Sequence, residues 1–70
     1  MTQLKKRSVN LNGHATSVTM EEPFWIALRD IAKARGQSLN ALIAQIDETR
    51  EGNLSSALRV FALEYFKIKH

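Results

Sequence analysis

The chain contains no cysteine, so a fold built from its 70 residues has to be held together without disulfides or cysteine-bound metal. A chain of this length buries about 60% of the surface that its unfolded form exposes, and its core contributes roughly 3–5 kcal/mol. Natural domains of this size are often stabilised by a second chain. We therefore expect one small domain that gains part of its core by forming an oligomer.

The net charge of +3 is concentrated at the N-terminus. Residues 1–20 contain Lys5, Lys6 and Arg7 and no acid, whereas the remaining residues contain equal numbers of bases and acids. A basic block before a neutral body is typical of chains that bind polyanions, above all nucleic acid, although three clustered bases also occur on solvated tails. We predict a flexible basic arm over residues 1–6 and a single domain over residues 7–70.

Residues 7–20 are predicted to form one or two short strands. β-branched residues are frequent there, and Asn12-Gly13 is the dipeptide that best suits a two-residue hairpin turn. Because side chains alternate along a strand, Val18 and Met20 lie together on its apolar face. An isolated hairpin is marginal in water, so this segment needs helices or a further strand to pack on, and a second copy could supply that strand.

Three helices are predicted after the strand segment, over residues 22–35, 39–50 and 54–67. Acids and a proline suit the first turn of a helix, Gly36 suits a C-terminal cap, and Ser38 suits an N-cap. Each segment carries an apolar stripe, and the broad third stripe, which Val60 and Leu63 extend, favours a subunit interface. The predicted core and interface residues of the helices are Phe24, Trp25, Leu28, Ile31, Leu39, Leu42, Ile43, Ile46, Leu58 and Phe61.

The sequence offers little support for catalysis. Nucleophilic catalysis needs a nucleophile, a base and an orienting group that converge, and the histidines are His14 beside the turn and His70 at the end of the chain. We interpret His14 as a solvated or hydrogen-bonded strand-end residue, with a contact to a nucleic-acid phosphate as the alternative. We predict no enzymatic activity, no catalytic or metal-binding residue and no cofactor.

Membrane insertion is not expected either. No apolar run approaches the roughly 18 residues that a membrane span needs. The basic start is followed by a polar segment, not by the apolar stretch of a signal peptide. We expect a cytoplasmic protein, associated with the nucleoid if it binds DNA.

The order of these elements points to a known family. A strand, a helix opened by acids and proline, a glycine turn and a helix beginning Ser-Leu-Asn follow the spacing of ribbon-helix-helix proteins, the group of the Arc and methionine repressors. From Arg7 to about Phe66 the chain resembles a compact bacterial subfamily of this group that keeps GH-x-TS in the ribbon, FW in the first helix, SLNALI in the second and a third C-terminal helix. The resemblance implies a mainly α fold with a short N-terminal β ribbon.

The resemblance further implies an intertwined homodimer, in which each chain gives one strand to the ribbon and the helices share one core. It places Thr16, Val18 and Met20 against the core. If Arg7 to Leu11 forms an additional strand, the family's simple ribbon is elaborated, and both arrangements stay open at this point. With the basic cluster and His14 included, the expected DNA-contacting residues are Lys5, Lys6, Arg7, His14, Ala15, Ser17, Thr19, Ser38 and Asn40.

We therefore expect a homodimeric regulator of transcription that binds double-stranded DNA with sequence preference, its ribbon in the major groove and the start of the second helix on a phosphate. The outward residues Ala15, Ser17 and Thr19 are shorter than the side chains that make bidentate contacts with bases. The alternative is a dimeric protein-interaction or antitoxin-like module that has lost base-specific reading and docks a protein partner through its third helix.

Overall fold

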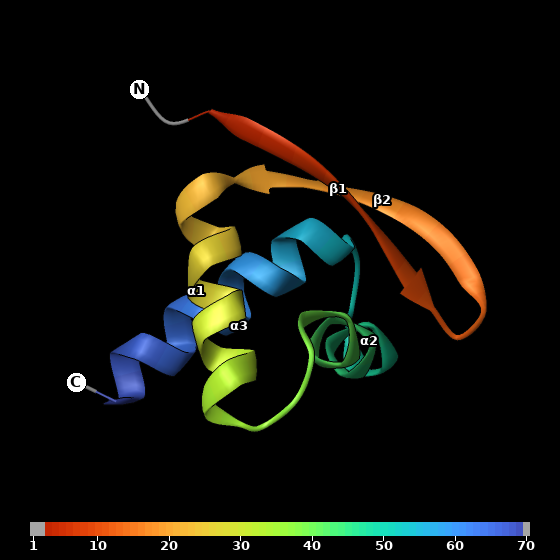
Figure 1. The fold of residues 1–70 in the computed structure, drawn as a ribbon. Helices are drawn as coiled ribbons and strands as arrows, with labels where there is room; N and C mark the ends of the chain where they lie inside the picture. The colour runs from red at the N-terminus through yellow and green to blue at the C-terminus, as the bar shows by residue number, and fades with distance from the viewer. Residues whose placement is uncertain (1–2, 70) are drawn as a thin grey trace.

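The structure is a computed structural model that describes residues 3–69. A β-hairpin lies across a group of three helices (Figure 1). The helices begin where the sequence pattern places them and end within two residues of the expected ends. The elements are β1 (Leu4–Leu11), β2 (His14–Glu21), α1 (Glu22–Ala34), α2 (Leu39–Thr49) and α3 (Leu54–Lys69).

Both strands of the ribbon come from the same chain. β1 and β2 pair antiparallel from Leu11 opposite His14 to Leu4 opposite Glu21. The two residues of the turn have positive φ angles, 54° at Asn12 and 86° at Gly13, as the turn that matches the twist of a hairpin requires. Arg7 to Leu11 therefore belongs to the additional strand that the sequence left open, and the ribbon is elaborated within one chain, while a strand contributed to a second copy stays a prediction.

The predicted flexible arm over residues 1–6 is also corrected. Leu4, Lys5 and Lys6 belong to β1, and residues 1 and 2 lie outside the described residues. Lys5 pairs with Met20 and Lys6 with Thr19, so the strand continues to the far end of β2. The indole Nε1 of Trp25 donates a hydrogen bond of 3.0 Å to the carbonyl oxygen of Lys5, which fixes this part of β1 to α1.

The hairpin has one face toward the helices and one face away from them. Directly opposed residues of two paired strands share a face. The inner ribbon face carries Lys5, Arg7, Val9, Leu11, His14, Thr16, Val18 and Met20, of which Val9, Leu11, Val18 and Met20 are buried. The outer ribbon face carries Leu4, Lys6, Ser8, Asn10, Ala15, Ser17, Thr19 and Glu21, and all of these are exposed except the half-buried Glu21.

A single chain buries a core of its own. The largest fully buried side chains come from β2 and all three helices: Met20, Trp25, Leu28, Ile31, Leu42, Ile43 and Leu58. Ile46 is also buried, and Phe24, Leu39 and Phe61 are partly buried against this cluster. On α3, Val60 is 52% exposed and Leu63 is 65% exposed, so the third stripe is not buried on both sides within one chain.

Thr16 is the exception among the expected core residues, because it is exposed. Its partner Val9 is buried, since α2 packs against β1. On the β2 side, Thr16 instead borders a hollow of about 430 Å³ between the hairpin and the loop that joins α2 to α3. Thr16 therefore lies outside the core of one chain, because alternation gives the face of a strand but not how far the helices extend beneath it, and its place in a dimer interface stays a prediction.

No helix within residues 3–69 combines the length and the apolar character that crossing a membrane requires.

Replacing Trp25 tests whether its indole holds the ribbon on the helices. Trp25→Phe keeps an aromatic ring but removes ring volume and the donor to the Lys5 carbonyl oxygen. We expect the free energy of unfolding to fall by about 1–3 kcal/mol, measured by urea denaturation. Ile26→Ala, on the same helix at a side chain that is 48% exposed, should change it by no more than about 0.5 kcal/mol. Equal losses in the two variants would contradict this role.

Candidate nucleic-acid interface

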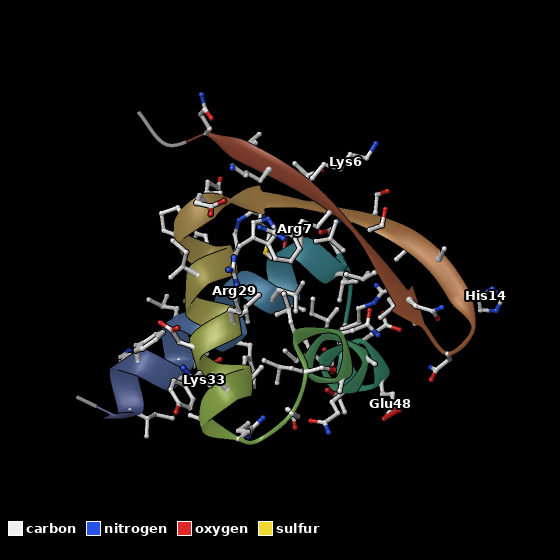
Figure 2. The ribbon with its side chains drawn as sticks, in the orientation of Figure 1. Lys6, Arg7, His14, Arg29, Lys33 and Glu48 are labelled. Carbon is white, nitrogen blue, oxygen red and sulfur yellow. The ribbon has the colours of Figure 1, made fainter. Side chains whose placement is uncertain are left out.

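The outer ribbon face is an exposed surface made of mostly short side chains. Ser8 lies opposite Ser17, and Lys6 lies opposite Thr19. The side chain of Lys6 extends away from the helices (Figure 2). Two strands with small polar groups and one long cation form a surface that can approach another macromolecule closely and exchange hydrogen bonds with it.

The basic cluster of the sequence is divided between the two faces of the ribbon. Lys5 and Arg7 lie on the inner face, and only Lys6 lies on the outer face. The Nζ atom of Lys5 is 3.8 Å from a carboxylate oxygen of Glu22. The guanidinium carbon of Arg7 is 5.6 Å from the centre of the Trp25 ring, in a cation–π contact. The three charges therefore do not act as one arm, because strand alternation separates them.

Arg7 borders a hollow beside the open edge of β1. This hollow has a volume of about 380 Å³ and is lined by β1, α1 and the first residues of α2: Arg7, Ser8, Val9, Trp25, Leu39 and Asn40. A helix N-terminus carries partial positive charge on its backbone N–H groups. Arg7 adds a full positive charge at the same place, so the hollow suits a negatively charged group.

The two polar side chains expected to bind a phosphate have partners within the chain. The Oγ atom of Ser38 accepts a hydrogen bond of 3.0 Å from the backbone N–H of Ala41, which makes Ser38 the N-cap of α2. Asn40 hydrogen-bonds to the backbone of Asn10 in β1. Both residues lie at the start of α2 as expected, but Asn40 faces the ribbon edge.

The remaining expected contacts lie on the ribbon. Ala15, Ser17 and Thr19 are exposed on the outer ribbon face, where alternation places them. His14 is exposed at the turn end of the hairpin and extends away from the helices (Figure 2). The expected residues thus lie in two places, on the outer ribbon face and around the hollow beside β1.

Other residues of this region were not singled out from the sequence. Ser8 and Asn10 join the outer ribbon face because β1 is a full strand, which the Asn12-Gly13 signal alone left open. On the opposite edge, the Oγ atom of Ser55 donates a hydrogen bond of 3.3 Å to the carbonyl oxygen of Thr19. This contact joins residues far apart in the chain and has no local signal in the sequence.

An ion pair ties the end of β2 to α3. The Nε atom of Arg59 donates a hydrogen bond of 2.9 Å to Oε1 of Glu21, and the guanidinium of Arg59 also lies over the Phe24 ring. The hydrogen bond from Arg59 is the main cause that lowers the pKa of Glu21 below its ordinary value. The negative form of Glu21 is therefore the one that the folded chain favours.

The hairpin packs on α1 and α2 with one face exposed, and α2 begins beside the hairpin edge. This arrangement defines a class of domain. The chain belongs to the ribbon-helix-helix family, because the sequence profile of the ribbon-helix-helix domain matches residues 4–66. A solved structure of an uncharacterized protein from Bordetella pertussis Tohama I is similar over 97% of this chain, with a TM-score of 0.84 and 32% identity. The chain spans 59% of the length of that protein. No curated protein matches the chain.

The Glu21–Arg59 pair gives a testable pH dependence. Since folding lowers the pKa of Glu21, the pair stabilises the fold above the unfolded pKa, and this contribution is lost as the pH falls through the folded pKa. Glu21→Gln should therefore unfold at lower urea than the native chain at pH 7, and the difference should disappear in acid. Glu51→Gln, at an exposed residue, is the matched control. A difference that stays the same at every pH would contradict the assignment.

Proposed function

We propose that the chain binds double-stranded DNA as a homodimer and regulates transcription, with the outer ribbon face in the major groove and the start of α2 near a backbone phosphate. The observation that carries the proposal is the division of the hairpin into an inner face that packs on the core and an outer face that is exposed at every position except Glu21 at the end of β2. Membership of the family agrees with it, because ribbon-helix-helix domains are generally DNA-binding regulators of transcription.

The chemistry of the outer ribbon face suits the edges of base pairs. The major groove of B-DNA admits a two-stranded ribbon, and the short side chains let the strands come close to the bases. Lys6 is a long donor that can reach the acceptors of guanine. The hydroxyl groups of Ser8 and Ser17 can donate or accept, and the methyl groups of Ala15 and Thr19 can contact the methyl group of thymine.

The hollow beside β1 suits a phosphate of the DNA backbone. Arg7 is held there by the Trp25 ring, and the backbone at Leu39 and Asn40 begins α2. A phosphate in this hollow receives the charge of Arg7 and the partial charge of the helix together. The hollow adjoins β1. A DNA strand whose phosphate binds in the hollow therefore runs beside the ribbon, and this keeps the outer ribbon face in the groove.

A homodimer is supported by the apolar side chains that α3 leaves exposed. Val60, Leu63 and Ile68 are exposed large apolar residues of this helix. One chain already buries its own core. In this proposal a second copy therefore packs on surfaces that the first chain leaves exposed, and does not complete a shared core. Two copies would place two ribbons on successive stretches of one duplex, which increases both affinity and sequence preference.

The alternative function is docking of a protein partner. The observation that favours it is a groove of about 590 Å³ between α2 and α3, whose apolar lining includes Ile46, Val60 and Phe61. Salt distinguishes the two functions, because apolar docking responds little to salt whereas phosphate contacts weaken steeply.

The function is tested by selecting DNA fragments. The protein is mixed with genomic fragments at about 50 and 200 mM salt, and its mass in solution is measured alongside. We expect a dimer that retains a subset of fragments at the higher salt. A monomer, or a dimer that loses every fragment at the higher salt, would contradict part of the proposal. A protein that binds no fragment at either salt would favour the docking function.

Arg7 and Lys6 should give different signatures when replaced. Arg7→Ala should weaken binding to all sequences alike and reduce the slope of log affinity against log salt by roughly 0.9 per lost phosphate contact. Lys6→Ala should change the preference among sequences. Lys33→Ala removes the same charge as Lys6→Ala from the end of α1 that is remote from the ribbon (Figure 2), and serves as the control. Equal effects of Lys6→Ala and Lys33→Ala would exclude the outer ribbon face from recognition.

A further inference from the structure

The side chain of Asn40 hydrogen-bonds to the ribbon in the way that the backbone of a neighbouring strand would. Its Oδ1 accepts a hydrogen bond of 2.8 Å from the backbone N–H of Asn10, and its Nδ2 donates one of 2.7 Å to the carbonyl oxygen of Asn10. One side-chain amide thus satisfies both backbone groups of a residue that is 30 positions away in the chain.

Those backbone groups lie on the open edge of β1. In an antiparallel pair, residues alternate between bonding to the opposite strand and directing their N–H and C=O away from it. Leu11 and His14 flank the two-residue turn and form a bonded pair, so Asn10 belongs to the alternate set. The start of α2 therefore occupies the edge of β1 at this residue, where another strand would otherwise add.

We propose that Asn40 acts in DNA binding as a positioning residue, which fixes the edge of the ribbon to the start of α2, and not as a phosphate ligand. This inference rests on the proposed function. The amide of Asn40 has one carbonyl oxygen and two N–H donors, and the Asn10 backbone uses the oxygen and one donor. The charge that meets a phosphate comes instead from Arg7 and from the helix backbone.

The two hydrogen bonds add a constraint that apolar packing does not supply. Val9 and Leu11 are buried where β1 packs on α2, but apolar contacts are not directional and leave small displacements open. The amide of Asn40 fixes one residue of β1 to one residue of α2 through two directional bonds. DNA has to meet the outer ribbon face and the hollow at once, so a fixed distance between them lowers the cost of ordering the site on binding.

The test combines amide hydrogen exchange with salt-dependent binding. In the free protein, Asn40→Ala should speed exchange of the Asn10 amide about tenfold or more, because the Asn40 oxygen is the acceptor that protects it. Binding to DNA at fixed salt should fall about five- to tenfold, with the salt slope unchanged. Asn53→Ala is the matched control, because it removes a side-chain amide that accepts from Ser56 N at the start of α3 and keeps both hydrogen bonds between Asn40 and Asn10, so it should leave the Asn10 amide unaffected.

A second variant guards against loss of folding. Asn40→Asp keeps an acceptor for the Asn10 N–H but has no donor for the Asn10 carbonyl, so exchange of the Asn10 amide should lie between those of the native chain and Asn40→Ala. Unchanged exchange in Asn40→Ala would overturn the clamp. A salt slope reduced by roughly 0.9 in Asn40→Ala would show a phosphate ligand and overturn the positioning role. Failure of the native chain to bind DNA would contradict the proposed function, while the exchange result still decides the clamp.

Discussion

The structure depends on the burial of one tryptophan beneath the hairpin. Trp25 is fully buried, and its Nε1 bonds to the carbonyl oxygen of Lys5, so a single side chain packs in the core and holds the first strand on α1. The outer side of the same ring carries the guanidinium of Arg7. Because a buried indole N–H needs an acceptor, the position of β1 follows from the position of α1.

This arrangement gives a single chain both strands of its ribbon. A hairpin closed at Asn12-Gly13 forms its ribbon within one chain, and the apolar part of its inner face packs on the three helices. Most of the outer ribbon face then stays exposed, while Arg7 and the start of α2 bring positive charge to the hollow beside β1. Recognition of a polyanion by these two surfaces requires that they stay at a fixed distance, and the Asn40 amide spans the elements that carry them.

Local signals predicted much of this fold. Apolar stripes, the Ser38 cap and the Gly36 turn were sufficient to place the three helices, and alternation placed Ser17 and Thr19 on the outer face. The extent of β1 was missed, because its support comes from Trp25, which lies in another element and leaves no periodic pattern in residues 4–6.

The candidate site was harder to predict than the helices. Adjacent basic residues look like one cluster in a sequence, but in a strand the side chain of Lys6 lies on the opposite face from those of Lys5 and Arg7. The resemblance to the family implied that Asn40 contacts a phosphate, and the sequence gives no sign of its hydrogen bonds to Asn10, because Asn10 is distant in the chain.

The proposed function requires the outer ribbon face to meet DNA. Nuclear Overhauser effects between protein methyl groups and DNA protons test it most directly, since such effects report only close contacts. We expect contacts from the methyl groups of Ala15 and Thr19 and none from the two methyl groups of Val18, which lies on the inner face. Contacts confined to the side chains of the groove between α2 and α3, such as Val60, would contradict it.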